Sequence, residues 1–155
     1  MLNNKLKNKK KFLFLILVLF LLDRLTKEIV RAAIPLNFSI PVLKNSFHIT
    51  HITNTGIAFG LARNNNQLFL ILSGAILLLL ILFFVKSEKR SELVPVSLII
   101  AGAAGNILDR IVYGSVCDFL DFRIWPVFNL ADSFITIGGV VLFYLEFLKK
   151  PRTDI

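Results

Sequence analysis

An uninterrupted apolar segment, residues 68–85, is the feature of the sequence that most constrains the fold. Its 18 residues carry no charge. A helix that rises about 1.5 Å per residue needs about 20 residues to cross a hydrocarbon core of about 30 Å. Residues 93–112 and 130–148 are two further candidates. The 155-residue chain is 55% hydrophobic and contains 15 Phe, which is too apolar for an ordinary soluble domain. We therefore predict that residues 1–155 form one integral membrane domain.

The N-terminal apolar segment needs a separate argument, because residues 12–22 would form only about 16 Å of helix. The segment follows five lysines, so a cleaved signal peptide is the main alternative. A cleavage site of small residues would then follow, but the next residues are charged. A helix that continues to residue 31 would cross the membrane, with Asp23–Lys27 and Arg24–Glu28 as ion pairs at i,i+4 spacing. In that helix Lys27 and Arg31 could snorkel to the far interface.

The distribution of positive charge predicts the orientation of these spans. Five lysines precede the first span, three basic residues lie in 86–92, and three lie in the C-terminal tail. The connection 35–67 carries two basic residues and the connection 113–129 carries one. Because cytoplasmic connections are rich in Lys and Arg, both termini are expected in the cytoplasm. Basic residues that flank apolar segments do not form a nucleic-acid surface. The predicted fold is therefore an all-α membrane protein with four transmembrane helices, at about 12–31, 68–85, 93–112 and 130–148.

The 35–67 connection is long for a plain linker. Its β-branched and aromatic residues alternate in part, as in Phe47 to Ile52, which predicts a small strand-rich element on the extracytoplasmic surface. Gly56 and Gly60 permit tight turns or the close approach of a ligand to the backbone.

This topology places four polar segments on the extracytoplasmic face. Ionisable groups at the membrane boundary are costly to place, so they are candidates for function. The four segments are 54–60, 105–110, 116–122 and 129–133.

Asp118 and Asp132 are the strongest candidates for catalysis. Asp132 begins a predicted span, where it could simply cap the helix. Asp118 lies between Cys117 and Phe119 in an apolar stretch and needs a partner. If the two carboxyl groups meet, they can share one proton, and one can act as general base on a water while the other acts as general acid.

Spacing alone leaves the pairing open, because two other aspartates lie on the same face. Asp109 could form an ion pair with Arg110, and Asp121 could be a surface charge or a partner of Arg123.

Other functions remain as alternatives. His48 and His51 form an H-x-x-H pair, but the three or four converging ligands of a metal site are missing from the sequence. Cys117 as a nucleophile would need an activating base. A non-enzymatic transporter subunit or channel could use its aspartates to coordinate a cation or relay protons.

Five motifs together resemble those of the lipoprotein signal peptidases, the type II signal peptidases of bacteria. Each motif is weak alone, but five in this order within a four-span topology are specific. They are Asp23-x-x-Thr26-Lys27, Asn54-Thr55-Gly56-x-Ala58-Phe59, Gly105-Asn106-x-x-Asp109-Arg110, Val116-x-Asp118-Phe119 and Phe128-Asn129-x-Ala131-Asp132-Ser133.

The resemblance implies four membrane helices with a small extracytoplasmic β-rich cradle and a short surface helix. It implies an intramembrane aspartic endopeptidase with Asp118 and Asp132 as its catalytic dyad. Such an enzyme cleaves diacylglyceryl-modified prolipoproteins just before the lipidated cysteine. The residues implied to line or support the substrate site are Asn54, Gly56, Asn106, Arg110 and Asn129.

The resemblance also implies that no metal or organic cofactor is needed and that globomycin inhibits the enzyme. It implies a bacterial cytoplasmic (inner) membrane location, with the active site on the extracytoplasmic side among membrane lipid. We expect a monomer with no nucleic-acid partner. The resemblance assigns no role to Asp23 or Lys27.

Overall fold

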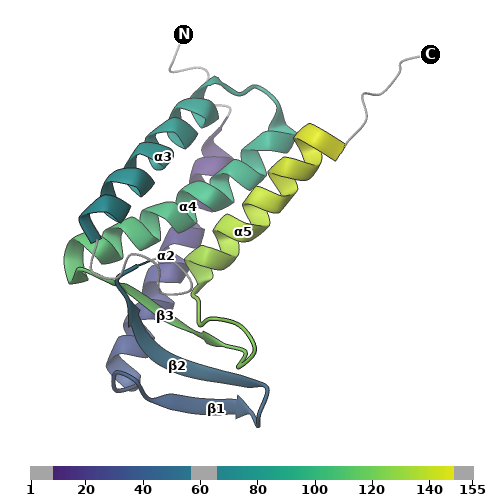
Figure 1. Cartoon of the computed structure of the whole chain (residues 1–155). Coiled ribbons are helices and arrows are strands. Elements are labelled where there is room, and N and C mark those ends of the chain that lie inside the picture. Colours follow the sequence, from purple (N-terminus) through teal and green to yellow (C-terminus); the bar gives the residue numbers. More distant parts are fainter. Residues whose placement is uncertain (1–8, 57–65, 149–155) are drawn as a thin grey trace.

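A computed structural model describes residues 9–56 and 66–148. The helices are α2 (Lys10–Ala33), α3 (Asn66–Lys86), α4 (Arg90–Tyr113) and α5 (Leu130–Phe143), which continues into the π-helical turn η2 (Tyr144–Leu148). The strands are β1 (Ser39–Leu43), β2 (Phe47–Asn54) and β3 (Val116–Asp121). Figure 1 shows the helices packed along one another, with the strands at one end of the bundle and η2 at the other.

Three helical segments are long and apolar enough to cross a membrane, namely Asn66–Lys86, Arg90–Tyr113 and Leu130–Phe147. They agree with the predicted spans 68–85, 93–112 and 130–148. Helix α3 is apolar on all sides, yet only Phe69 and Phe84 are buried, as expected of a helix surrounded by lipid. Helix α2 is also long, at 24 residues, but its second half carries five charged residues.

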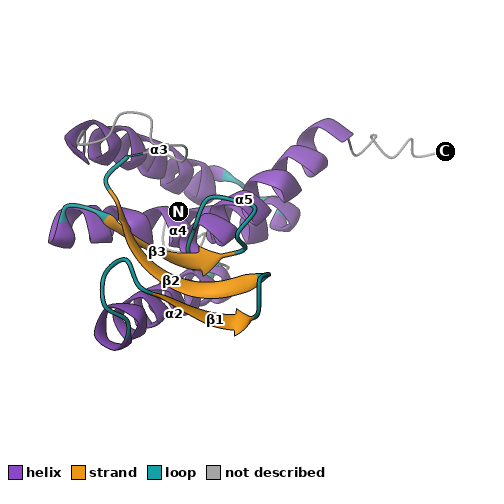
Figure 2. Ribbon diagram, turned by 60° about the horizontal axis from the view of Figure 1, so that its bottom comes forward, coloured by secondary structure: helices purple, strands orange, loops and turns teal. Residues whose placement is uncertain are grey.

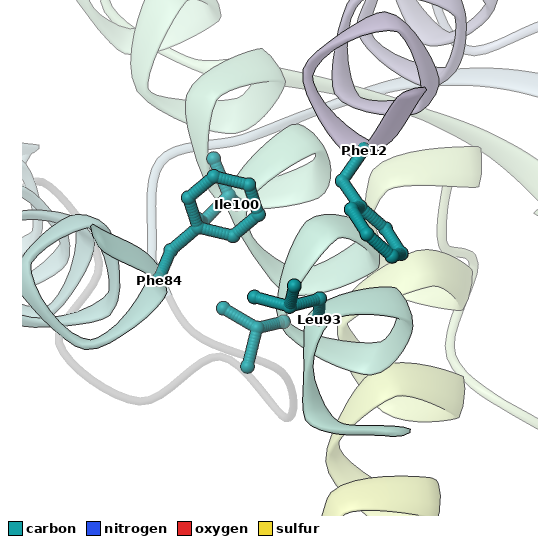
Figure 3. Packing of buried hydrophobic residues seen from close by; sticks show 5 residues of the cluster. Phe12, Phe84, Leu93 and Ile100 are labelled. Atoms are coloured by element: carbon teal, nitrogen blue, oxygen red, sulfur yellow. The ribbon is translucent and has the colours of Figure 1, made fainter. Parts of the chain in front are cut away.

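Helix α4 lies at the centre of the bundle, and the other three helices pack against it. Figure 3 shows Phe12 of α2 and Phe84 of α3 pointing toward Leu93 and Ile100 of α4. These side chains form a buried cluster at the end of the bundle far from the strands. Small residues allow the α4 and α5 backbones to touch, since a Cβ on Gly138 would lie 2.6 Å from the carbonyl oxygen of Pro95.

The strands form one antiparallel sheet in the order β1-β2-β3 (Figure 2). The prediction of strands within 35–67 is confirmed by β1 and β2. Strand β3 lies in 113–129, where the sequence predicts an extracytoplasmic connection with a polar segment and no strand. Gly114 ends α4 with a φ of 69°, in the left-handed region that favours glycine, and the chain then enters β3.

A second buried cluster attaches the sheet to the C-terminal end of α2. It consists of Val30, Ile34, Cys117 and Phe119. Because Cys117 and Phe119 flank Asp118 in β3, this packing fixes the position of Asp118 relative to the helices. No helix lies in 35–56, so the short surface helix expected within 35–67 is not found there, and the remaining residues 57–65, with Gly60, lie outside the described residues.

Candidate active site

Asp118 is a buried carboxyl group on β3, with 2% of the residue exposed. Asn54 Nδ2 donates to its Oδ2 at 3.0 Å, and Asn129 Nδ2 donates to its Oδ1 at 2.6 Å. Burial raises the pKa of Asp118 to about 7, and the nearby charge of Asp132 adds to this rise. Asp118 can therefore hold a proton near neutral pH.

Asp132 lies in the first turn of α5, where Asn129 is the N-cap. Asn129 Oδ1 accepts from the Asp132 backbone N–H at 3.0 Å, and Asp132 Oδ2 accepts from the Asn129 backbone N–H at 3.2 Å. Asp132 therefore belongs to a capping box and is not itself the cap. Its Oδ1 accepts a further hydrogen bond from Asn106 Nδ2 at 2.8 Å.

Two asparagines join the aspartates into one network. The Asn129 NH2 group that donates to Asp118 also lies 3.3 Å from Asn106 Oδ1, and Asn106 donates to Asp132. Asn129 is completely buried. The predicted pair of aspartates, 14 residues apart in the sequence, is thus brought into a single buried hydrogen-bond network.

Arg110 borders this network on α4. Its NH1 group donates to the Asn106 carbonyl at 3.4 Å and its NH2 group to the Gly56 carbonyl at 3.5 Å. Gly56 in turn donates its N–H to Asn54 Oδ1 at 3.0 Å. The five residues predicted to support the substrate site therefore lie together, around Asp118 and Asp132. The buried Nε of Arg110 has no hydrogen-bond partner within the described part of the chain.

A second group of charges adjoins the network on α2. Lys27 is completely buried, so the prediction that it snorkels to an interface is wrong. Its Nζ lies 2.9 Å from Asp23 Oδ2, 3.4 Å from Asp109 Oδ2 and 2.8 Å from Asn106 Oδ1. The predicted Asp23–Lys27 pair is confirmed. Lys27 stays inside because α4 supplies an acceptor and an opposite charge, which are more favourable partners than a distant headgroup.

Asp109 has cationic partners on α2. It contacts Arg24, and its Oδ1 lies 2.9 Å from Arg31 NH2. The suggested ion pair between Asp109 and Arg110 is not among the contacts of the described residues. Arg24 also contacts Glu28, as the i,i+4 spacing predicted.

Asp121, the last residue of β3, makes contacts separate from those of the two central aspartates. Its Oδ2 accepts from Thr50 Oγ1 at 2.8 Å and from Arg123 NH1 at 2.9 Å. Burial alone would raise the pKa of Asp121, but these hydrogen bonds outweigh burial and hold the pKa below its ordinary value. The suggested pairing with Arg123 is confirmed, so Asp121 has the features of a structural carboxylate.

The thiol and imidazole groups do not form a nucleophilic or metal site in the described ranges. Burial raises the pKa of Cys117 to about 11, so its thiol stays protonated near neutral pH. His48 Nδ1 lies 3.0 Å from Ser39 Oγ, and His51 Nδ1 lies 2.7 Å from the Ile34 carbonyl oxygen. Among residues 9–56 and 66–148, no three His, Cys, Asp or Glu side chains converge as metal ligands.

The model of one protein family, described as signal peptidase (SPase) II, matches residues 15–148 of the chain. The chain belongs to the signal peptidase II family. The lipoprotein signal peptidase of Halothermothrix orenii is 42% identical over 129 residues, which cover 82% of this chain and 88% of the relative. The lipoprotein signal peptidase of Nostoc punctiforme is 40% identical over 153 residues, 96% of both chains.

Solved structures agree with this membership of the signal peptidase II family. A bacterial membrane enzyme solved at 2.3 Å has a TM-score of 0.85 and 30% identity, covering 94% of both chains. Another, solved at 1.9 Å, has a TM-score of 0.82 and 31% identity, covering 90% of this chain and 94% of its own. The resemblance inferred from the five motifs is confirmed, and as a family member the chain is a membrane peptidase.

Proposed function

We propose that this chain is an intramembrane aspartic endopeptidase that removes the signal peptide from diacylglyceryl-modified prolipoproteins, cutting before the lipidated cysteine. The observation that carries the aspartic mechanism is the buried network in which Asn129 and Asn106 connect Asp118 with Asp132. The substrate class is supported by the relatives, which are named lipoprotein signal peptidases.

The two carboxyl groups have different environments, which favours different roles. Asp132, at the start of α5, is the general base that takes a proton from a water, and the resulting hydroxide attacks the scissile carbonyl carbon. Asp118, protonated near neutral pH because it is buried, donates to the developing oxyanion. The tetrahedral intermediate then collapses as the C–N bond breaks: the proton on Asp132 passes to the leaving amine, and a hydroxyl proton of the intermediate returns to Asp118.

Arg110, Asn54, Gly56, Asn106 and Asn129 are proposed to hold the substrate peptide and the dyad. The buried Nε of Arg110 is a donor without a hydrogen-bond partner in the described chain, and Asp118 and Asp132 are near enough for their charges to act on Arg110. A peptide carbonyl oxygen is a matching acceptor. No metal or organic cofactor takes part in this mechanism.

The proposed membrane arrangement has four spans, with α2 as the fourth. Asp23, Lys27 and Asp109 are buried together between α2 and α4, so the charges of α2 face protein while residues such as Phe14 and Leu25 are exposed for lipid. The basic segment between α3 and α4 lies at the end of the bundle opposite the sheet (Figure 1). That end is cytoplasmic under the positive-inside rule. The sheet then forms an extracytoplasmic cradle.

This arrangement suits a lipid-anchored substrate. A diacylglyceryl group confines the substrate to the bilayer, so its scissile bond stays near the headgroups. Asp118 and Asp132 lie where β3 and the start of α5 meet the helices, which is that depth in the proposed orientation. The enzyme is proposed to act as a monomer in the bacterial inner membrane and to be inhibited by globomycin.

A synthetic diacylated precursor peptide tests the proposed function. Wild-type protein in detergent micelles should cleave it before the lipidated cysteine, and globomycin should stop the reaction. Asp118→Asn should lower kcat at least about 100-fold, because general acid catalysis contributes about 10²- to 10⁴-fold. Asp121→Asn is the matched control and should keep near-wild-type kcat. An Asp118→Asn protein that cleaves the precursor normally would exclude the dyad.

A further inference from the structure

We propose that Lys27 is a positioning residue for the dyad, which turns the side-chain amide of Asn106 so that its NH2 group donates to Asp132. This inference rests on the proposed function and deepens it. It gives a role to a buried cation that the chemistry of peptide cleavage does not itself require.

The contacts of Asn106 determine which way its amide points. Lys27 Nζ lies 2.8 Å from Asn106 Oδ1, and an ammonium group has three donors and no acceptor. The atom facing Lys27 must therefore be the amide oxygen. The NH2 group then faces the opposite way, 2.8 Å from Asp132 Oδ1, where a carboxylate needs a donor.

Without Lys27 the amide of Asn106 would lose most of its orientation. Its oxygen would accept only from Asn129 Nδ2, at 3.3 Å. A turn of the amide by about 180° would place its oxygen against Asp132 Oδ1, so that two acceptors would face each other. Asp132 would lose a donor and shift, and Asn129, which holds Asp118, would lose an acceptor.

Asp23 holds Lys27 in place and connects the pair to α5 by a second route. Asp23 Oδ2 lies 2.9 Å from Lys27 Nζ, while Asp23 Oδ1 accepts from the backbone N–H of Ala131 at 3.0 Å. Ala131 directly precedes Asp132 in the chain. On α4, Gly105 makes room for Asp23, because a Cβ at residue 105 would overlap Asp23 Oδ2.

Lys27 makes no hydrogen bond or ion pair with Asp118 or Asp132 among the described residues, so its contact with the dyad runs through Asn106. Its charge also acts on Asp118 from a distance, and removing the charge of Asp23 together with that of Lys27 keeps the net charge of the site unchanged. A salt bridge that serves only stability would leave the geometry of Asn106 unchanged when the two charges are removed together. If Lys27 positions Asn106, the loss of kcat on removing Lys27 depends on the presence of Asn106. If Lys27 only stabilises the fold, the loss of kcat is the same with and without Asn106.

The test variant replaces the ion pair by neutral groups of similar size, Asp23→Asn together with Lys27→Met. Removing Lys27 alone would leave Asp23 buried without its main counter-ion, which is strongly destabilising. In the double variant the amide introduced at position 23 keeps an oxygen for the Ala131 N–H, and Asp109 keeps Arg24 and Arg31 as partners. Lys89→Met is the control, because Lys89 pairs with Glu92 at the other end of α4.

Cleavage of the diacylated precursor is measured for the double variant with Asn106 intact and with Asn106→Ala. With Asn106 intact, kcat should fall about 10- to 100-fold while KM changes less than about two-fold, because misplaced groups lose transition-state stabilisation. In the Asn106→Ala background the same change should lower kcat by less than about three-fold. Lys89→Met should leave kcat unchanged.

Equal losses of kcat in the two backgrounds would overturn the proposal, as would an unchanged kcat with Asn106 intact. If the double variant does not accumulate as folded protein, Lys27 serves the fold and the proposal also fails. Asp118→Asn in the same assay distinguishes a failure of the proposed function from a failure of the proposed role of Lys27. An active Asp118→Asn protein contradicts the proposed function, whereas an inactive one beside a fully active double variant contradicts only the role of Lys27.

Discussion

Asn129 donates from its side-chain NH2 group to Asp118 Oδ1 at 2.6 Å, the shortest hydrogen bond to either central aspartate within the described residues. The oxygen of the same amide accepts from the backbone of Asp132 at 3.0 Å. One side chain therefore caps α5 and holds the carboxyl group of β3. The relative position of the two aspartates depends on this single residue.

Asn129→Ser should separate the two interactions of Asn129, which are the N-cap of α5 and the hydrogen bond to Asp118. Serine is as good an N-cap as asparagine, so Tm should stay near wild type. Serine is too short to replace the hydrogen bond to Asp118, so kcat for the diacylated precursor should fall about 100- to 1,000-fold, as when one preorganised donor is lost. Asn129→Ala, which lacks both interactions, should also lower stability by about 1 kcal/mol. A Ser variant with wild-type kcat would show that the contact with Asp118 is dispensable.

The pH dependence of kcat should report the proton on Asp118. Because the pKa of this group is raised to about 7, activity should fall on the alkaline side as the proton is lost. The charged groups that act on Asp118 are Asp132 from α5, Lys27 from α2 and Arg110 from α4. A profile that stays flat between about pH 6 and 9 would contradict a protonated Asp118.

Stability should depend on pH through the same group. Folding raises the pKa of Asp118 from 3.8 to about 7, so its stabilising effect is complete below about pH 4 and is lost as pH rises through 7. Asp118→Asn cannot ionise. The Tm of this variant relative to wild type should therefore increase between about pH 4 and pH 8, measured by thermal unfolding in detergent. A difference in Tm that does not change with pH would count against a buried, titrating Asp118.

Gly105→Ala should disturb the contact between α2 and α4. The added Cβ would overlap Asp23 Oδ2, so stability should fall by about 1–3 kcal/mol and kcat should fall with it. Gly139→Ala is the matched control, because no atom of the described residues outside the neighbouring turn of its own helix lies within 4 Å of its Cβ position. That variant should be neutral, or more stable by up to about 1 kcal/mol through helix propensity. Equal Tm values for the two alanine variants would show that α4 can move away from Asp23 without cost.

Cys117→Ala should retain catalysis. The thiol is buried between Val30, Ile34 and Phe119, so its truncation should lower Tm, but kcat should remain within about two-fold of wild type because a protonated thiol is a poor nucleophile. Loss of cleavage in a folded Cys117→Ala protein would restore the thiol protease as an explanation.

The apolar helices could be predicted from the sequence because membrane spans depend on length and composition alone. Strand β3 could not be predicted from the sequence. Five of its six residues are buried, so its sequence shows no alternation of apolar and polar positions, and its pairing partner lies more than 60 residues earlier. The partial alternation of Phe47 to Ile52 did indicate β2.

The environment of Lys27 shows a second limit of structure prediction from the sequence. On an isolated helix, a lysine near the membrane boundary is expected to reach for the headgroups. In the structure it turns inward because Asp109 and Asn106, about 80 residues later, offer an opposite charge and an acceptor. Spacing within α2 predicted the Asp23–Lys27 pair, since both residues lie on one helix. Nothing local indicated the contacts with α4, or the hydrogen bond from Asn66 to the Arg110 carbonyl.

The most direct test of the aspartic mechanism is the cleavage rate of purified Asp132→Asn protein, reconstituted in liposomes with the diacylated precursor. The amide introduced at position 132 has one oxygen that can still accept from Asn106, and Asn129 remains the N-cap of α5, but the amide cannot take a proton from water. Cleavage should fall at least about 100-fold with no loss of folded protein. Cleavage by Asp132→Asn at the wild-type rate would contradict the account.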